Sequence, residues 1–519
     1  MGGFFVENER GSWGSNIGFL LAAIGSAVGL GNIWAFPYKM GKSGGFVFLL
    51  AYLLLAVFIG FILMMSELAL GRNTRSSVVG AYHAVSRKFS WIGWLAMLAP
   101  FLIMSFYSVL GGYCIEYMSL NLSNLAFGGS KTATGGELFG SMLSNPFGCA
   151  LFTVLFLLIC LVIVKGGISG GIEKFNDIGM PALFIMLIII IIRSLTLPNA
   201  SEGLKFMFVP GYALKAGFIA KMPNFVTVLS TAGGQMFFSL SLAMGAMITY
   251  GSYLDKKENL VSNSAVIVIA DTVVALMAGV AVIPAAVSNG ISRGIAPADI
   301  KLGGPNLLFV TLQDVFSAMG RVGPLFGVLF YLLVLIAAVS SAISLMEVLV
   351  TFFLDRAKLK GKTTTTRNKV TFWVTLAILA EAIIVAIDGL GTNGLWLPGQ
   401  GGGATISGWN DCWLDFMDCW SEGIAMPLGA MLMALMIGWE IKPKGTLDEI
   451  HMGISENHHK LDCFYTICIK FIVPIAMAFI LAGQMISFFK KTTISYIIAF
   501  VLLAIFWVTA LVPSKKVAV

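Results

Sequence analysis

The sequence predicts an all-α polytopic membrane protein with about 12 transmembrane helices. Of its 519 residues, 58% are hydrophobic and only 11% are charged, and the mean hydropathy is +0.89. Apolar stretches long enough to cross the ~30 Å hydrocarbon core of a bilayer recur along the whole chain. The expected spans lie near residues 15–39, 45–70, 92–124, 147–164, 178–196, 225–253, 262–286, 321–354, 370–388, 413–439, 463–487 and 494–513.

The first span contains a stretch that is poorly suited to an unbroken helix. Residues 25–37 read Gly-Ser-Ala-Val-Gly-Leu-Gly-Asn-Ile-Trp-Ala-Phe-Pro, and the glycines, the polar asparagine and the closing proline each weaken helical hydrogen bonding. Irregular backbone at membrane depth is tolerated where it is buried in protein or lines a cavity, so its free polar groups should face a partner. A bound ligand is one interpretation, and glycines that merely let two helices pack closely are the other.

The distribution of basic residues predicts how the spans are oriented. Lysines and arginines concentrate in the loops after the even-numbered spans, and the alternate loops hold fewer over a greater length. The positive-inside rule therefore predicts that both termini are cytoplasmic. The net charge of +7 is then mainly a topology signal, and binding of anionic lipid or nucleic acid by the basic loop at 356–369 is the weaker interpretation.

The sixth span is the second interrupted element, since glycines bracket the hydroxyls of Ser239 and Ser241. Spans one and six lie five elements apart. Matching interruptions in two halves predict inverted five-helix repeats, with helices 1 and 6 broken at mid-membrane and a binding site there. The expected division is a cytoplasmic N-terminus at 1–14, repeats at 15–196 and 225–440, and two further helices within 463–513.

Other spans carry polar residues at membrane depth. Asp271 would cost about 2.5–3.5 kcal/mol if unpaired, and such residues usually mark an ion or substrate path; a hydrogen-bonded structural aspartate is the alternative. Ser340 and Ser341 suit either cation coordination or close helix packing. Glu67 either snorkels to the surface or caps broken backbone. The phenol of Tyr107 needs a hydrogen-bond partner.

Given these residues, the chain resembles the neurotransmitter:sodium symporter family, and in its length the bacterial amino-acid members. The resemblance spans nearly the whole chain. Its most specific stretches are residues 25–37, 234–245 and 337–347, with Arg10 and Trp13 before the first span. Short termini and a short outer loop between spans three and four look prokaryotic, which implies the plasma membrane of a bacterium, its inner membrane.

The resemblance implies a binding site for an amino acid at the first break. The backbone N–H groups of Leu30 and Gly31 would bind its carboxylate, because free N–H groups at the start of a half-helix favour an anion. Tyr107 would be a second donor. The remaining substrate contacts that the resemblance implies are Ala27, Ile103, Phe238, Ser239, Ser241, Met244, Ser341 and Leu345.

The resemblance also implies two sodium ions. One site would use Ala27, Asn32, Ser239 and Asp271, completed by the substrate carboxylate. The other would use the carbonyls of Gly25, Val28 and Ala337 with the hydroxyls of Ser340 and Ser341. Oxygen-only shells suit a hard cation.

A cytoplasmic gate and a support for the second break follow from the same matching. Arg10 and Asp355 resemble the pair that closes the cytoplasmic gate. Glu67 and Gln235 resemble residues that support the broken part of span six.

The chain departs from the family pattern at two positions. Ala35 stands where the family often has an arginine, so Asp418 lacks its usual outer partner; Lys39, one helical turn further, is a candidate replacement. Asp271 stands where many members have asparagine. Its fixed charge predicts transport that does not need chloride.

Together these expectations describe a sodium-coupled symporter of neutral, mainly hydrophobic L-amino acids that works by alternating access. A carrier of an osmolyte or an amine is the alternative, but Gly29 disfavours it because amine-specific members place an aspartate there. A membrane enzyme or a channel would need a catalytic constellation or a continuous polar pore, and the scattered intramembrane acids supply neither. The expected partners are the amino acid, sodium and the bilayer, with no nucleic acid; the oligomeric state stays open.

Overall fold

The computed structural model describes residues 11–128, 134–300, 302–304, 306–361, 365–395, 412–453 and 459–488. Every regular element among these residues is helical. Nine of the described helices are long and apolar enough to cross a membrane, and the bent pair Asn16–Ala27 and Gly31–Lys42 makes a tenth span. This confirms the all-α polytopic fold class.

The first six spans follow the expected order. They are formed by α1 (Asn16–Ala27), η1 (Gly31–Ala35) and α2 (Phe36–Lys42); α3 (Phe46–Leu55), η2 (Ala56–Gly60) and α4 (Phe61–Thr74); α6 (Trp91–Phe127); α8 (Pro146–Lys165); η3 (Ile168–Glu173) and α9 (Lys174–Leu195); and α12 (Phe225–Ser239) with α13 (Ala246–Gly251).

The remaining described spans are continuous helices. They are α14 (Leu260–Ser292); α16 (Gly323–Leu359); α17 (Arg367–Asp388); α18 (Trp413–Asp418), η7 (Cys419–Ala425), α19 (Met426–Leu435) and η8 (Met436–Glu440); and α21 (His459–Ile467), η9 (Cys468–Ile472) and α22 (Val473–Phe488). The expected twelfth span, at 494–513, lies outside the described residues.

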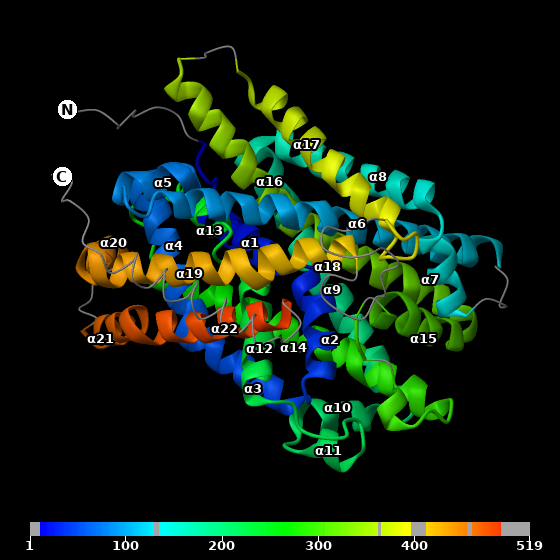
Figure 1. Ribbon diagram of the computed structural model, residues 1–519. Coiled ribbons are helices and arrows are strands. Elements are labelled where there is room, and N and C mark those ends of the chain that lie inside the picture. Colours follow the sequence, from blue (N-terminus) through cyan, green and yellow to red (C-terminus); the bar gives the residue numbers. More distant parts are fainter. Residues whose placement is uncertain are drawn as a thin grey trace.

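Short helices gather at the two ends of the bundle (Figure 1). The helices α5 (Val78–Val85) and α20 (Pro443–His451) lie at one end, and α7 (Gly135–Leu143) and α15 (Leu312–Ala318) lie at the other. The first pair belongs to loops that follow even-numbered spans, and the second to the alternate loops. The structure thus separates the two sets of loops as expected of a chain that crosses the bilayer repeatedly.

The first span is enclosed by other helices, whereas the fifth has a free face. The helix α1 packs against α9, α14 and α16. On α9, Ile178, Ile185 and Ile192 are at least 60% exposed, and their spacing of seven places them on one face. This face suits contact with lipid.

The fifth span begins earlier than expected. Its helix starts with η3 at Ile168, rather than near residue 178, and continues without interruption to Leu195. As a result Asn176, which precedes the expected span at 178–196, lies inside the observed span and is fully buried.

Candidate functional site

The first break separates α1 from η1. Val28 leaves the helical region with φ −78° and ψ 98°, and the two halves of the span are bent by 45°. All residues from Gly25 to Gly31 are buried. The glycine-rich stretch therefore forms the irregular, buried backbone that its sequence predicts.

The glycines of this break are positions of close approach by polar side chains. A Cβ atom at Gly29 would lie 2.3 Å from Ser341 Oγ and 2.6 Å from Tyr107 Oη. A Cβ atom at Gly25 would lie 2.0 Å from Asn176 Oδ1. Neither position has room for a side chain unless its neighbours move. Irregular backbone and close helix packing thus occur together at these glycines, and ligand binding there stays a prediction.

The second break lies between α12, which ends at Ser239, and α13, which begins at Ala246. Within it, Ser241 and Ala243 have φ angles of 53° and 59°, a region that non-glycine residues adopt rarely. Glu67 Oε1 accepts a hydrogen bond of 2.6 Å from Ala243 N. Since Glu67 is fully buried, it caps broken backbone and does not snorkel.

Gln235 contacts the other break. It lies in α12, and its Nε2 donates a hydrogen bond of 2.7 Å to Gly31 O. The resemblance grouped Gln235 with Glu67 as support for span six, but the backbone that it contacts belongs to span one. The two broken spans are therefore linked directly.

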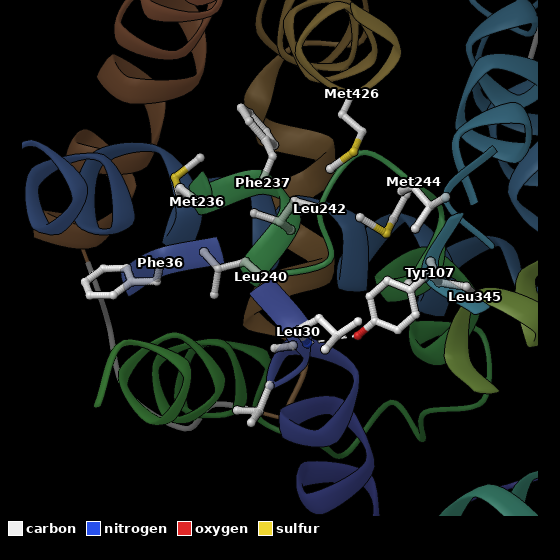
Figure 2. Close-up of a cluster of buried hydrophobic side chains, with 14 of the residues drawn as sticks. Leu30, Phe36, Tyr107, Met236, Phe237, Leu240, Leu242, Met244, Leu345 and Met426 are labelled. Carbon is white, nitrogen blue, oxygen red and sulfur yellow. Dashed lines mark hydrogen bonds between the residues drawn. The ribbon is translucent and has the colours of Figure 1, made fainter. Parts of the chain in front are cut away.

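Two hydrogen-bond donors expected to bind a carboxylate face each other. Leu30 N donates a hydrogen bond of 3.0 Å to Tyr107 Oη, and Figure 2 shows the phenol turned toward the backbone of Leu30. Tyr107 is 2% exposed. An anionic oxygen that takes the place of this contact would accept from both groups.

Asp271 is the centre of what we call the carboxylate cluster, which consists of Asn32, Tyr52, Ser239 and Asp271. Its oxygens accept hydrogen bonds of 2.7 Å from Asn32 Nδ2 and 2.9 Å from Ser239 Oγ. Tyr52 Oη donates a third, of 3.0 Å. All four residues are fully buried. Three donors replace the water that a buried carboxylate loses, so Asp271 is structurally satisfied and also lies beside two expected cation ligands.

Tyr52 is the member of this cluster that the sequence analysis missed. It lies on α3, separated from Asp271 by 219 positions in the chain. The available signal was a phenol inside an apolar span, which needs a hydrogen-bond partner. Tyr107 carries the same signal, since its phenol also lies inside an apolar span.

The hydroxyl cluster consists of Ser340, Ser341 and the backbone carbonyls of Gly25, Ser26, Val28 and Ala337. Ser340 Oγ lies 2.9 Å from Ala337 O and 3.4 Å from Val28 O. Ser341 Oγ lies 3.0 Å from Ser26 O and 3.3 Å from Gly25 O. The structure therefore brings together the five residues that the resemblance grouped around a second cation, and adds the carbonyl of Ser26.

The side chains of the implied substrate pocket are mostly buried and apolar. Ile103, Met244 and Leu345 are at most 3% exposed. The Phe238 and Tyr107 rings lie 6.2 Å apart between centroids. The pocket also has two smaller members. Ala27 is the last residue of α1, and Ser241 Oγ donates a hydrogen bond of 2.7 Å to Ser26 O.

The outer end of the first span carries an ion pair that the sequence analysis did not identify. Lys39 pairs with Glu422, and both side chains are at least nine-tenths buried. Glu422 lies one helical turn after Asp418, in the π-helical segment η7. The carboxylate of Asp418 also interacts electrostatically with Glu422 and with Lys39. The ion-pair partner of Lys39 is therefore Glu422, and a gating role for Lys39 with Asp418 stays a prediction.

The expected inner gate is only partly within the described residues. Arg10 lies outside them. Asp355 Oδ2 accepts a hydrogen bond of 2.7 Å from the backbone N–H of Ser77, which precedes α5. The pairing of Arg10 with Asp355 therefore stays a prediction.

The chemistry of the site suits a hard cation. In the described part of the chain, no three or more His, Cys, Asp or Glu side chains are grouped to hold a metal ion. The two clusters offer instead carbonyl, hydroxyl and amide oxygens with a single carboxylate. Such ligands disfavour transition metals, which prefer imidazole and thiolate.

Residues 10–134 and 140–519 match the family described as the Sodium:neurotransmitter symporter family. The chain is 33% identical over 475 residues to the uncharacterized sodium-dependent transporter YhdH of Bacillus subtilis (strain 168), an alignment that covers 91% of this chain and 97% of YhdH. It is 25% identical over 538 residues to the sodium- and chloride-dependent glycine transporter 1 of Xenopus laevis, covering 92% and 79% of the two chains.

Among solved structures, the crystal structure of MhsT in complex with L-phenylalanine has a TM-score of 0.76 and 34% sequence identity to this chain. The match covers 92% of this chain and 100% of MhsT. Fold, family match and relatives agree on a multi-pass membrane transporter rather than an enzyme. The chain therefore belongs to the sodium:neurotransmitter symporter family, whose members are sodium-dependent transporters of small molecules.

Proposed function

We propose that the chain is a sodium-coupled symporter of neutral, mainly hydrophobic L-amino acids that works by alternating access. The observation that carries this proposal is the pairing of Leu30 N with Tyr107 Oη at 3.0 Å in the first break. It places two donors side by side, and a carboxylate that replaces their mutual contact would accept from both. Oxygen clusters suited to cations lie on the same broken segment.

Direct coupling between substrate and sodium follows from how close these groups are in the chain. Gly29 N donates a hydrogen bond of 3.0 Å to Asn32 Oδ1, so the amide of the carboxylate cluster is tied to the backbone beside Leu30. A substrate carboxylate bound at Leu30 would complete the shell of a sodium ion at Asn32 and Asp271. Each ligand would then raise the affinity of the other.

The proposed side-chain preference rests on the pocket residues. Ile103, Met244 and Leu345 are apolar, and none of the proposed pocket side chains carries a charge that could neutralise a charged substrate side chain. Met244 is unbranched and adapts to different shapes, which favours tolerance of several aliphatic or aromatic amino acids. The description of MhsT, which names L-phenylalanine as its bound ligand, supports this choice.

An amine or osmolyte carrier is less well supported. An amine without a carboxylate would need an acidic side chain nearby, and Gly29 has no room for one beside Ser341 and Tyr107. The name of the Xenopus relative gives glycine, also an amino acid, as its substrate.

We further propose two sodium ions, one at each cluster, and a location in the bacterial inner membrane with both termini cytoplasmic. In alternating access, the repeats at 15–196 and 225–440 would move against each other around the fixed site. The basic loops after even-numbered spans support the orientation.

The buried pair of Lys39 and Glu422 is a candidate outer gate. It joins α2 to η7, so outward opening of the first span would separate the two charges. Lys39→Met and Glu422→Gln should each accelerate dissociation of bound amino acid, and the exchanged pair Lys39→Glu with Glu422→Lys should restore part of the loss. The exposed pair of Lys205 and Glu202 provides the control, since breaking it should not change the dissociation rate.

Equilibrium binding of L-phenylalanine to the purified protein over a sodium series tests the proposed function. Binding should strengthen with sodium, and Asn32→Ala should weaken it in a way that extra sodium partly restores. Asn263→Ala is the matched control, because Asn263 is also a buried asparagine but pairs with Asn16 away from the site. Affinity that does not depend on sodium, or a preference for lysine or glutamate, would contradict the proposal.

A further inference from the structure

Asn176 on α9 is a buried amide with one unused oxygen. The residue is fully buried, and its Nδ2 donates a hydrogen bond of 2.8 Å to Ile172 O. Its Oδ1 is buried and has no hydrogen-bond partner among the residues that the structure describes. A buried acceptor left without a partner is unusual in native proteins and commonly indicates an ion or a water molecule.

The unused oxygen points at the hydroxyl cluster. A Cβ atom at Gly25 would lie 2.0 Å from Asn176 Oδ1 and 3.2 Å from Ser340 Cβ. The amide therefore reaches the backbone of Gly25 on the same side as Ser340. Both of these residues belong to the hydroxyl cluster, in which Gly25 O lies 3.3 Å from Ser341 Oγ.

The hydrogen bond to Ile172 also determines the orientation of the amide. Because Nδ2 is held by the carbonyl one turn earlier on its own helix, Oδ1 is the atom that faces Gly25. An amide carbonyl is a neutral oxygen donor of the same chemical kind as the backbone carbonyls already in the cluster. Its orientation is set before any cation binds.

We propose that Asn176 Oδ1 is a further oxygen ligand of the cation at the hydroxyl cluster. This inference rests on the proposed function, in which that cation is sodium. The shell then consists of neutral oxygens from α1, α9 and α16, which suits a monovalent hard cation. It also connects the fifth span to cation binding, because loss of the cation leaves the Asn176 carbonyl without a partner.

The alternative is that Asn176 merely packs against the glycine. In that case the oxygen makes only a weak contact with the Cα hydrogens of Gly25, and sodium affinity does not depend on the amide. The two hypotheses differ in the effect of a negative charge at position 176. A carboxylate at a cation site would raise sodium affinity, whereas a carboxylate in a packing contact would not.

The test compares Asn176→Ala and Asn176→Asp with Ser194→Ala. Ser194 is a buried polar residue on the same helix that bonds to Val280 O, away from the hydroxyl cluster. Sodium affinity is measured through equilibrium binding of L-phenylalanine over a sodium series, with sodium and lithium compared for each variant. Asn176→Ala should raise the half-saturating sodium concentration by about tenfold, a size typical of losing a supporting group at a metal site.

Asn176→Asp should lower the half-saturating sodium concentration and change the ratio of sodium to lithium affinity. Amino-acid affinity at saturating sodium should stay at the wild-type value in both variants, and Ser194→Ala should behave as wild type. Unchanged sodium affinity in Asn176→Ala, or weakened sodium affinity in Asn176→Asp, overturns the inference. If wild-type binding itself does not depend on sodium, the proposed function fails instead, so the two failures are distinguishable.

Discussion

The two oxygen clusters beside the first break differ in charge. In the carboxylate cluster, Asp271 accepts hydrogen bonds from Asn32, Ser239 and Tyr52. In the hydroxyl cluster, Ser340 and Ser341 contact neutral carbonyls. Both clusters share the released backbone of the first span, so this difference arises from the helices that face it: α14 supplies an acid and α16 supplies hydroxyls.

This difference in charge predicts which of the two proposed cations is harder to remove. A cation that leaves the carboxylate cluster leaves behind a buried negative charge, which is costly in a low-dielectric interior. A cation that leaves the hydroxyl cluster leaves only neutral groups, and these can return to hydrogen bonds with carbonyls. We therefore expect sodium at the hydroxyl cluster to be released more easily.

The largest expected effect is that of Asp271→Asn. Removing one partner of a buried charge pair costs about 3–5 kcal/mol, so the half-saturating sodium concentration should rise by at least about a hundredfold. Equilibrium binding of L-phenylalanine over a sodium series measures this. Asp255→Asn, a change at an exposed aspartate, should have no effect. A shift of less than tenfold in Asp271→Asn would show that the charge is not used for sodium.

Ser340→Ala should have a smaller effect, because it removes one neutral oxygen and leaves the charge of the site unchanged. A loss of about 0.5–1.5 kcal/mol corresponds to a twofold to tenfold weaker sodium affinity. The same binding series measures it, with Ser119→Ala on the exposed face of α6 as control. If Ser340→Ala weakened sodium binding as strongly as Asp271→Asn, the two clusters would not differ as proposed.

Tyr52→Phe removes one of the three donors to Asp271 and keeps the ring. Asn32 and Ser239 still contact the carboxylate, so we expect sodium affinity to change by only about twofold to fivefold. Tyr117→Phe is the matched control, because the buried hydroxyl of Tyr117 has no hydrogen-bond partner in the described part of the chain. Wild-type behaviour of Tyr52→Phe would mean that the phenol plays no part in holding the carboxylate.

The smallest expected effect is that of replacing chloride with gluconate in wild-type uptake assays. A fixed carboxylate at Asp271 supplies the negative charge near the proposed sodium ion, so sodium-dependent uptake should continue unchanged. The Xenopus relative, by its name, depends on chloride as well as sodium. Uptake that collapses in gluconate would assign the charge compensation to chloride and not to Asp271.

The sequence by itself determined the architecture and the broken elements of this protein. Apolar stretches of membrane length and glycines inside two of them are local signals, since they depend only on neighbouring residues. The same holds for Asp271, because an acid in an apolar span is visible without a fold. Resemblance then grouped residues from distant spans, and the structure brings most of these groups together.

Only the tertiary structure identified the partners that complete these groups. Tyr52 meets Asp271 across 219 positions, and Lys39 meets Glu422 across 383. Asn176 precedes the expected fifth span at 178–196, and its burial follows from the early start of that span. Such contacts leave no periodic or local pattern in the chain, because the packing of separate helices decides which side chains meet.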